Sequence, residues 1–461
     1  MFLRVLALIC LVTTINCSSS KAERYVKLPV VHSTNRKVFS KADADERSIS
    51  TVPLANRSDV AYYAKLNIGT PAQEIFAQLD TGSFELWVNP DCNTLESSSD
   101  VRFCQAVGHY DPSASTTAVK LPGTTLLEYG IGNASIEYVT DTISLTGSAD
   151  TLQDVQFGVA FETSQEFAGI LGIGYGINMT IRYKNLIDQL ADQGVTNTKA
   201  FSLALGSQDD EGVIIFGGLD TSKFTGTLQT LPIIPPGNSP DQVPRYWIQM
   251  SSVSLRPPSG QVKGYANTSL PVFLDSGSTL SLLPTAVAEA ISADFGGQAN
   301  AQAGYYLVDC SLRDEPGTVD FAFDGVTIHV PYSEFIREYA SPFGSMCALG
   351  ITPSDDFTLL GDTVLRSAYA VFDQTNNAIH LAEYVNCGSK AVEITTNLDM
   401  GTVKGDCDGL PFPGSNSTTA ANQTSAAETN GATTLHTLDM TRFNPIFTTL
   451  FVTHLLFGYV V

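Results

Sequence analysis

The sequence predicts an all-β protein built from two related lobes. Many short apolar runs are separated by Gly, Pro, Asn and Asp turns, which is typical of β-structure. An apolar run that ends in Asp, followed by Thr or Ser and then Gly-Ser, occurs twice, at Asp80 and at Asp275. Each copy is followed by an apolar stretch that ends in Gly, at Gly172 and Gly361, after 92 and 86 residues. Two motifs repeated in the same order indicate a duplicated lobe, with one Asp in each copy.

The residues around the two aspartates suit a pair of carboxyl groups held close together. Gly82 and Gly277 have no side chain, so two loops can approach closely at these positions. Neighbouring hydroxyl groups can orient a carboxylate. They belong to Thr81, Ser83, Ser276 and Ser278. Two adjacent carboxyl groups cannot both ionise cheaply, so they share a proton. One then acts as a base and the other as an acid, which lets the pair activate water and protonate an amide without a metal ion or an organic cofactor.

Further motifs follow in an order that resembles the pepsin family (A1) of aspartic proteases, over about residues 60–385. They are the first-strand signature at 68–73, Trp87, the segment Tyr129-Gly130, the end of the first lobe at 216–220 and the last strands at 370–377. The resemblance implies a bilobal fold with a pseudo-two-fold axis and a central cleft, in which Asp80 and Asp275 are catalytic. It also implies a flap hairpin at Tyr129 and Gly130 that closes over the substrate, with Trp87 supporting it.

Two positions need separate interpretation. Phe84 departs from the second Ser that is frequent in the family, and we expect it to change the packing near the cleft. The dyad should remain intact because Ser83 is present. Asp362 lies beside the second apolar-Gly motif, and we interpret it as structural rather than as a third catalytic acid.

The N-terminal residues predict two segments that are removed on maturation. Residues 1–17 contain Arg4, an apolar run and then small polar residues, which indicates a secretory signal peptide rather than a buried helix. Residues 18–58 are the most basic stretch and suggest a propeptide. A Lys or Arg there can pair with the dyad at neutral pH, and acid would loosen that pairing. The alternative is a solvated arm without inhibitory effect. Arg47 and Arg57 are candidate processing points, although no Lys-Arg pair marks the site.

The first lobe is expected over residues 59–225 and contains a small cysteine loop. Cys92 and Cys104 can close this loop beside the cleft. Acidic residues lie in or next to it, at Asp91, Glu96 and Asp100. The family resemblance is strongest to fungal yapsin-type, GPI-anchored enzymes, in which an acidic loop here accompanies a preference for basic substrate residues. This loop is only mildly acidic, so basic and hydrophobic preferences both stay open.

The second lobe is expected over residues 226–385, and the cysteines suit an oxidising compartment. The family resemblance implies a Cys310–Cys347 disulfide, while Cys387 and Cys407 lie past the last family strand and can pair with each other. Cys10 and Cys17 leave with the signal peptide, so three bridges remain. Glycosylation sequons begin at Asn56, Asn133, Asn178, Asn267, Asn416 and Asn422. A glycan on Asn133, close to the flap tip, would slow flap closure or narrow the substrate range.

The C-terminal residues predict a membrane attachment signal. We expect residues 386–430 to form a Ser/Thr-rich extracellular stalk. The apolar run 446–461 has 16 residues, fewer than the roughly 18–20 of a spanning helix. A polar spacer and small residues precede it, as in a GPI-attachment signal over 431–461. We place the attachment at Asn430, with Gly431 or Ser425 as alternatives. A transmembrane anchor and a merely apolar tail are the competing interpretations.

Composition and missing motifs exclude several classes of function. The net charge of −22 argues against nucleic acid and against an electrostatic membrane partner. There is no His-Glu-x-x-His, no Gly-x-Ser-x-Gly and no phosphate loop, so a metalloprotease or serine hydrolase is not indicated. We expect a monomeric aspartic endopeptidase without metal or cofactor, acting on polypeptides at acidic pH. It would lie at the extracellular face of the cell membrane, with the cell wall or secretion as alternatives. The competing hypothesis is a catalytically silent protein that binds proteins or glycans.

Overall fold

The computed structural model describes most of the chain between residues 24 and 409. The described residues are 24–32, 61–89, 92, 98–130, 132–145, 150–164, 166, 168–207, 212–300, 304–341 and 344–409. Several predictions lie outside these ranges. They are the signal peptide at 1–17, the processing points Arg47 and Arg57, the GPI signal at 431–461, the sequons at Asn56, Asn416 and Asn422, and the attachment site Asn430.

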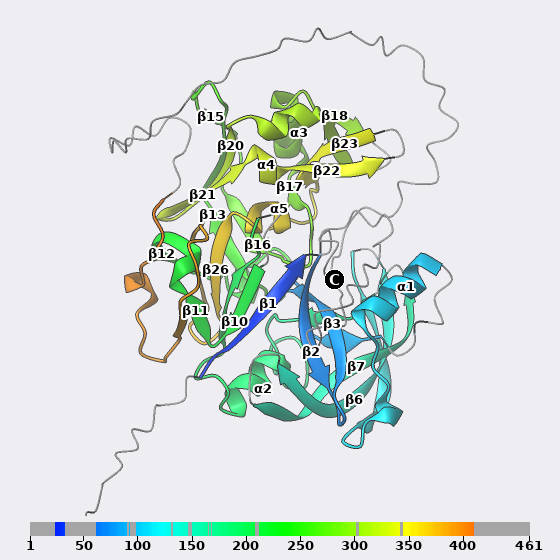
Figure 1. The fold of residues 1–461 in the computed structure, drawn as a ribbon. Helices are drawn as coiled ribbons and strands as arrows, with labels where there is room; N and C mark the ends of the chain where they lie inside the picture. Colours follow the sequence, from blue (N-terminus) through cyan, green and yellow to red (C-terminus); the bar gives the residue numbers. More distant parts are fainter. Residues whose placement is uncertain are drawn as a thin grey trace, which may run out of the picture.

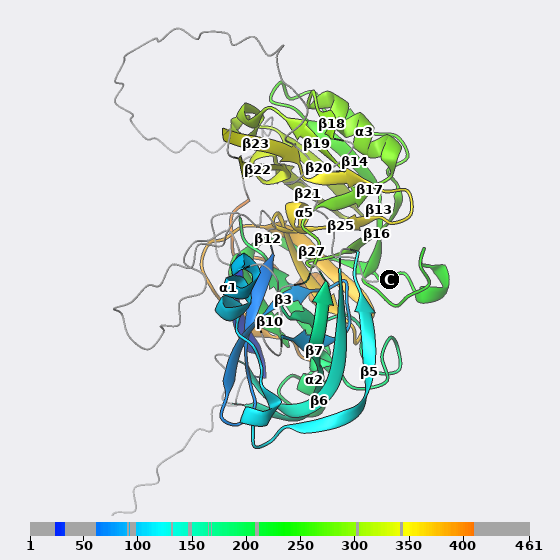
Figure 2. The same cartoon turned by 90° about the vertical axis from the view of Figure 1, so that its right-hand side faces the viewer.

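The fold is all-β, as the sequence predicts, and its largest sheet has thirteen strands (Figures 1 and 2). One half of this sheet is built by the first lobe. Its strands, in spatial order, are β2 (Tyr62–Ile68), β3 (Gln73–Asp80), β8 (Ile170–Gly172), β4 (Leu86–Val88), β7 (Thr151–Ser164), β6 (Asn133–Leu145) and β5 (Val119–Glu128). The other half runs between the lobes. Its strands are β12 (Phe224–Pro232), β27 (Ala378–Tyr384), β26 (Ala368–Asp373), β9 (Ala200–Ala204), β10 (Gly212–Phe216) and β1 (Val26–His32).

The second lobe lies above the first in Figure 1 and consists of three smaller sheets. The first comprises β13 (Trp247–Met250), β16 (Leu270–Leu274), β25 (Leu359–Leu360), β17 (Ser281–Leu283) and β24 (Ile351–Pro353). The second comprises β15 (Lys263–Gly264), β14 (Ser252–Arg256), β20 (Thr318–Phe323) and β21 (Val326–Pro331). The third comprises β18 (Gln298–Asn300), β19 (Tyr305–Val308), β23 (Gly344–Leu349) and β22 (Ile336–Ser341).

The helices are short and lie around the sheets. They are α1 (Ser98–Val107), α2 (Leu186–Asp192), α3 (Thr285–Asp294), α4 (Tyr332–Phe335) and α5 (Asp362–Leu365). None of the helices that the structure describes is long and apolar enough to span a membrane. The three cysteine pairs expected from the sequence are disulfides, namely Cys92–Cys104, Cys310–Cys347 and Cys387–Cys407.

Alternating burial explains why the strand before the first aspartate forms and where it ends. In β3, Ile75, Ala77 and Leu79 point into the core, while the residues between them are more exposed. The strand stops at Asp80 because Thr81-Gly82 turns the chain. Asp80 is therefore fixed at the end of a buried strand.

The expected lobe border at residues 225 and 226 cuts through β12. This strand pairs with β27, and β26 pairs with β9, so strands on both sides of the border share one sheet. The expected border therefore falls inside a strand of the sheet that both lobes share. The central sheet joins the lobes through backbone hydrogen bonds that composition does not reveal.

β1, in the expected propeptide, lies in the middle of the largest sheet. Val26 pairs with Phe216 of β10, and Val30 pairs with Ala64 of β2. Val26, Leu28 and Val30 are buried. The alternative of a solvated arm is therefore wrong for this strand, because its apolar side chains belong to the core.

The basic residue of this strand does not reach the dyad. Lys27 forms an ion pair with the buried Asp220, with 2.7 Å between Nζ and Oδ2. The Lys27 ammonium therefore stabilises the central sheet, and the expected pairing of a basic residue with the dyad is not made by Lys27.

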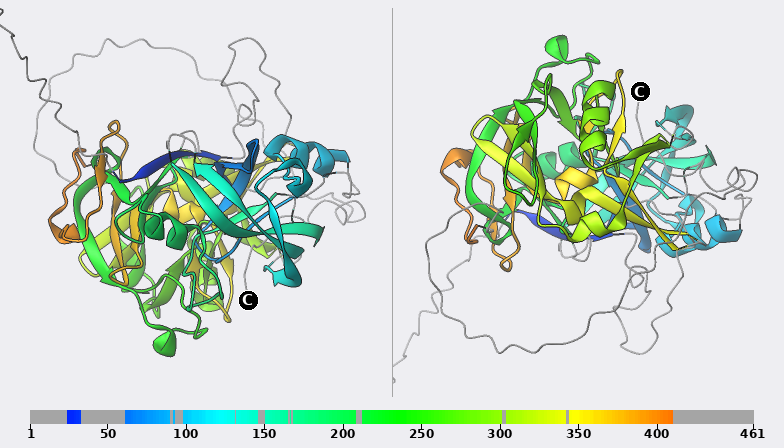
Figure 3. Two further views of the ribbon diagram at one scale, coloured as in Figure 1. Left: turned by 90° about the horizontal axis from the view of Figure 1, so that it is seen from below. Right: turned by 90° about the horizontal axis from the view of Figure 1, so that it is seen from above.

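The expected stalk begins too early, because residues 386–409 are folded onto the body. β28 (Ala391–Glu393) pairs with β11 (Gly218–Asp220), and Ile394 and Met400 are buried in a core cluster with Phe224. Figure 3 shows this segment, in orange, lying along the side of the molecule that carries β12. The correction has a physical reason: the segment buries apolar side chains and is tied down by the Cys387–Cys407 disulfide.

Removal of that disulfide is expected to destabilise the protein strongly. Replacing both Cys387 and Cys407 by Ser should lower the free energy of unfolding by about 3 kcal/mol, since the bridge closes a loop of roughly 20 residues. Equilibrium denaturation would measure the change. A Ser259→Ala variant, at an exposed position of the second lobe, serves as the control. An unchanged midpoint in the cysteine variant would contradict a role for residues 386–409 in the fold.

Candidate active site

The two aspartates lie at the ends of corresponding strands in the two lobes. β3 runs parallel to β8, and β16 runs parallel to β25. The N–H of Ile173 donates to the carbonyl of Asp80 over 2.9 Å, and the N–H of Asp275 donates to the carbonyl of Leu360 over 3.0 Å. The apolar-Gly motifs therefore lie beside the aspartates, as their similar offsets predict.

Reciprocal hydrogen bonds tie the two aspartate loops together across the lobes. Thr81 Oγ1 donates to the carbonyl of Leu274, and Ser276 Oγ donates to the carbonyl of Leu79, each over 2.9 Å. The N–H of Ser276 donates to Thr81 Oγ1 over 2.9 Å, and the N–H of Thr81 donates to Ser276 Oγ over 3.2 Å. These four bonds set the separation of the loops.

The carboxyl groups of Asp80 and Asp275 meet between the loops and are hydrogen-bonded to each other. Asp80 is 5% exposed and Asp275 is 2% exposed. The N–H of Gly82 donates to Asp80 Oδ1 over 2.8 Å, and the N–H of Gly277 donates to Asp275 Oδ1 over 2.9 Å. The hydroxyl of Ser83 donates to Asp80 Oδ2.

Both glycines next to the aspartates are required by this close approach. A Cβ on Gly82 would lie 2.6 Å from Asp275 Oδ1, which no real side chain tolerates. A Cβ on Gly277 would collide in the same way with Asp80 Oδ1. The glycines therefore let each loop press against the carboxyl group of the opposite lobe.

The surroundings make the two carboxyl groups unequal. Burial, followed by the neighbouring Asp80 charge, raises the pKa of Asp275 well above its usual range. Burial also raises the pKa of Asp80, but hydrogen bonds from Ser83 and from the N–H of Gly82 oppose this. The shared proton is therefore held by Asp275, and Asp80 carries the negative charge.

The β5–β6 hairpin carries Tyr129 and Gly130 at its tip and leans on Trp87. Trp87 Nε1 donates to the hydroxyl of Tyr129 over 2.6 Å. Tyr129 is 8% exposed, whereas Gly130 is exposed. The two side chains pack together with Ile136 and Ile170 in one apolar cluster. The hairpin is therefore supported by Trp87 of β4, the strand that follows Asp80.

The stretch of sequence that carries both aspartate loops and the hairpin matches a known family. The model of the eukaryotic aspartyl protease family matches residues 61–384. The chain belongs to this family of pepsin-type aspartic proteases. It is 35% identical to "Probable aspartic-type endopeptidase opsB" of Aspergillus oryzae, over 75% of this chain and 73% of that protein. It is 37% identical to "Secreted aspartic protease 3" of Candida albicans, over 73% of this chain and 83% of that protein.

The protease is also similar to a longer stretch of a third fungal protein. It is 33% identical to "Probable aspartic-type endopeptidase OPSB" of Arthroderma benhamiae, over 89% of this chain and 84% of that protein. Membership of the family makes this chain an aspartic endopeptidase with a bilobal fold.

Only one of the four hydroxyl groups expected to orient a carboxylate makes that bond in this protease. Ser83 binds Asp80, whereas Thr81 and Ser276 bond across the lobes. The Ser278 hydroxyl donates to the carbonyl of Leu280 over 2.9 Å and shapes its own turn. The expectation for Ser278 is therefore corrected, because its rotamer satisfies a backbone carbonyl of its own loop.

Replacing Trp87 by Phe is expected to weaken catalysis in the protease while leaving the fold intact. The variant keeps an aromatic ring but leaves the buried Tyr129 hydroxyl without its donor, which costs about 1–3 kcal/mol. If the lost hydrogen bond destabilises the closed position of the hairpin by this amount, kcat/KM should drop by about tenfold. Steady-state kinetics on Trp87→Phe, Tyr129→Phe and the double variant would measure it. Additive losses in the double variant would contradict the coupling.

The remaining predicted site residues are placed less directly. Asp91 and Glu96 lie outside the described residues, and of Asp100 only the backbone, in α1, is described. Asn133 is half-buried at the start of β6, whereas Asn178 and Asn267 are exposed.

Asp362 is fully buried, and burial raises its pKa well above the usual range despite the charge of Arg366. In the described ranges, no group of three or more His, Cys, Asp or Glu side chains could hold a metal ion.

Sequence reasoning missed a polar network that joins the lobes behind Asp80. Tyr246 donates its hydroxyl hydrogen to the carbonyl of Ile173 over 2.7 Å and accepts a bond from Gln374 Nε2 over 2.7 Å. Gln374 Nε2 also donates to the carbonyl of Gly174 over 3.0 Å. No motif marks these residues, because the contacts join positions up to 200 residues apart.

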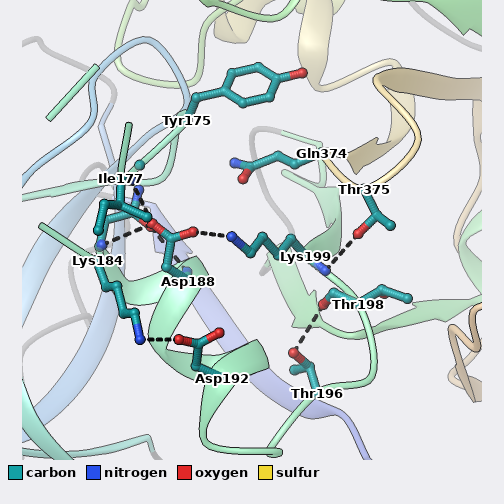
Figure 4. Close-up of polar contacts among 12 residues, drawn as sticks. Tyr175, Ile177, Lys184, Asp188, Asp192, Thr196, Thr198, Lys199, Gln374 and Thr375 are labelled. Carbon is teal, nitrogen blue, oxygen red and sulfur yellow. Dashed lines mark hydrogen bonds and ion pairs between the residues drawn. The ribbon is translucent and has the colours of Figure 1, made fainter. Parts of the chain in front are cut away.

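Figure 4 shows the outer edge of this junction, where α2 meets the turn after β26. Asp188 accepts from the N–H of Ile177 over 2.8 Å and from the ammonium of Lys199. The N–H of Lys199 donates to Thr375 Oγ1 over 3.0 Å. Lys199 therefore links the first lobe to the turn that carries Gln374.

Proposed function

We propose that Asp80 and Asp275 are the catalytic dyad of this endopeptidase. The observation that carries the proposal is the contact of two buried carboxyl groups, one from each lobe, under a hairpin that carries Tyr129. The unequal pKa shifts support one ionised and one protonated acid at the same pH.

The dyad performs the hydrolysis through a water molecule. Asp80 takes a proton from the water as its oxygen attacks the scissile carbonyl carbon, and Asp275 gives its proton to the carbonyl oxygen. The tetrahedral intermediate collapses when its C–N bond breaks. The leaving nitrogen takes the proton held by Asp80, and Asp275 regains one from the intermediate. The dyad returns to its starting state without a covalent enzyme intermediate, and no metal ion or cofactor takes part.

The substrate is an extended polypeptide that binds between the hairpin and the dyad. Extended peptides bind beside exposed strand edges through backbone hydrogen bonds, with pockets for alternate side chains. β5 forms one edge of the large sheet, next to the hairpin tip, which supports this mode. The chain acts as a monomer. Its preferred substrate residues are basic or hydrophobic.

The pKa shifts support stability at acidic pH. A carboxyl group whose folded-state pKa is raised favours folding below its unfolded pKa, and this contribution is lost as the pH rises through the folded pKa. Burial raises the pKa of Glu383 to about 7. Burial also raises the pKa of Asp80, Glu85, Asp275 and Asp362. Stability should therefore decline between roughly pH 4 and pH 7 as these groups ionise.

We place the mature enzyme on the extracellular face of the cell membrane, held by a GPI anchor at Asn430. The signal-like residues 1–17, three disulfides and the C-terminal apolar run after a polar spacer support this location. The Candida albicans relative is named a secreted protease, which agrees with an extracellular enzyme. Cleavage by a GPI-specific phospholipase should release the enzyme from cells, and release should fail if residues 446–461 instead span the membrane.

Residues 18–58 form a propeptide in this proposal. Cleavage at Arg47 or Arg57 would cut the chain between β1 and β2, and the basic residues of the segment would shield the dyad before cleavage. N-terminal sequencing of the active enzyme would test it. An active enzyme that begins immediately after the signal peptide, with β1 still attached, would contradict removal of the segment.

The dyad proposal is tested by peptide cleavage. Purified protein secreted as residues 18–430 would be incubated with a mixed peptide library from about pH 3 to about pH 7, with and without pepstatin. We expect cleavage that is strongest in acid and blocked by pepstatin, and the cut sites would decide between basic and hydrophobic preference. Absence of cleavage at every pH, after acid treatment and removal of the prosegment, would overturn the proposal and favour a silent binding protein.

A further inference from the structure

Each aspartate loop is held by a side chain from the opposite lobe, and the two holding groups differ in charge. In one direction, Gln78 Nε2 on β3 donates to the carbonyl of Gly277 over 3.2 Å. In the other direction, Arg245 Nη1 of the second lobe donates to the carbonyl of Gly82. The loop of Asp275 therefore receives a neutral amide, and the loop of Asp80 receives a guanidinium group.

Arg245 is buried and tightly surrounded. Its side chain is 3% exposed, and Nε donates to Asp241 Oδ2 over 2.7 Å. Asp241 also accepts from Trp247 Nε1 over 2.9 Å, so its carboxylate is fixed beside the guanidinium. A buried charge pair stabilises a fold little or not at all, because removing both charges from water is costly. The charge of Arg245 therefore calls for a role other than stability.

Three aromatic rings enclose the guanidinium and exclude water from it. The ring centroids of Phe84, Phe273 and Phe357 lie 5.1, 5.7 and 5.9 Å from Arg245 Cζ. Cation–π contacts of this kind stabilise a cation that has been removed from water. Phe84, the residue that departs from the family pattern, is thus the first-lobe part of this enclosure. Its position directly after Ser83 brings the enclosure next to the dyad.

The titratable groups that face the dyad differ in their ability to carry charge. Tyr129 on the hairpin stays neutral, since burial raises its pKa well above the usual range. Asp362 on α5 is held neutral in the same way, because burial raises its pKa. Arg245 faces both aspartates as a permanent cation, and its charge lowers the pKa of each. Asp241 is the carboxylate that partly neutralises it.

We propose that Arg245 is a positioning residue that clamps the Asp80 loop from the opposite lobe, and that its buried charge, adjusted by Asp241, sets the pH range of catalysis. The proposal rests on the assignment of Asp80 and Asp275 as the dyad. Gln78 provides the same clamp on the other loop without the charge. The two loops are thus mechanically equivalent but electrostatically different.

The sign of the effect differs between the two members of the ion pair. Replacing Arg245 by Met removes a positive charge, so the anionic dyad is less favoured and both limbs of the pH profile should move to higher pH. Replacing Asp241 by Asn removes a negative charge beside the guanidinium, so both limbs should move to lower pH. A residue with a structural role alone would lower activity in both variants but would not move the limbs in opposite directions.

The experiment compares pH profiles of kcat/KM for four variants of the full secreted enzyme. For Arg245→Met we expect the acid limb of the profile to move to higher pH by about one unit. This corresponds to a tenfold change in the proton dissociation constant of the dyad. Arg245→Lys keeps the charge, so its limbs should stay near those of the wild type although its kcat falls. Gln78→Met loses the neutral clamp, so its kcat should fall without a shift of either limb. Asp241→Asn should shift the limbs downward.

The role of the Arg245 charge can be tested even if one of the variants fails to fold. Near-ultraviolet circular dichroism would check each variant, and the double variant Arg245→Met/Asp241→Asn removes both charges and leaves no unpaired carboxylate. If Arg245→Met does not fold, the double variant carries the test, with a smaller upward shift expected because the loss of the Asp241 charge offsets part of the loss of the Arg245 charge. Limbs that coincide with the wild type in the folded charge-removing variants would overturn the proposal. An active Asp80→Asn variant would instead overturn the dyad assignment, so the two failures are distinguishable.

Discussion

Replacing Asp80 by Asn is expected to abolish proteolysis, with kcat/KM lowered by about 10⁴-fold. The variant keeps the shape of the side chain and can still accept the N–H bond of Gly82, so the loop should stay in place. It removes the group that takes the proton of water, and an amide has no comparable basicity. Cleavage of a fluorogenic peptide at the optimal pH would measure the loss.

A second Asp→Asn variant controls for the loss of a single negative charge. Asp324 is exposed in the turn between β20 and β21, in the second lobe and outside the dyad. Asp324→Asn should retain kcat/KM within about twofold, since surface substitutions rarely change the free energy by more than ±0.5 kcal/mol. Wild-type activity in Asp80→Asn would remove Asp80 from the catalytic role.

Replacing Gly82 by Ala is expected to have the next largest effect, a loss of about 10³-fold in kcat/KM. The new methyl group would lie 2.6 Å from Asp275 Oδ1 and would push the carboxyl groups apart. A displacement of about 1 Å at reacting groups can cost 100-fold on its own. The strain should also lower the free energy of unfolding by about 1–3 kcal/mol. Kinetics and equilibrium denaturation would measure the two effects separately.

Gly237→Ala is the matched control for this substitution. A Cβ at Gly237 would meet nothing within 4 Å, so the added methyl group disturbs no neighbour. It should leave kcat/KM unchanged. If Gly82→Ala were as active as this control, the close packing of the loop against Asp275 would have no catalytic importance.

Local patterns were sufficient to predict the centre of this protein. The repeated Asp-Thr/Ser-Gly-Ser motif and the similar offsets to Gly172 and Gly361 indicated two related lobes with one aspartate each. The resemblance to the pepsin family, carried by Trp87 and Tyr129 among other residues, implied a hairpin over the cleft. These features are short in sequence and carry strict steric requirements, such as a residue without Cβ at position 82. A pattern of residue types therefore predicts them well.

Position along the chain was a poor guide at both ends of the folded body. The alternative of a solvated arm was left open for residues 18–58, yet β1 supplies buried side chains between β10 and β2. Residues 386–409 were expected in a stalk, yet they pair with β11 and bury Ile394 and Met400. Both segments are short. Their burial depends on partners that lie far away in the sequence.

The electrostatics of the dyad were decided by contacts between distant residues. Ser278 has the residue type of a carboxylate ligand, but its rotamer satisfies the carbonyl of Leu280. Arg245 has no motif around it, and its charge acts on Asp80 because the second lobe folds against the loop of Gly82. Chemistry that depends only on residue types can be predicted from the sequence. Chemistry that arises from burial and from charges brought together across 163 residues exists only once the lobes have packed.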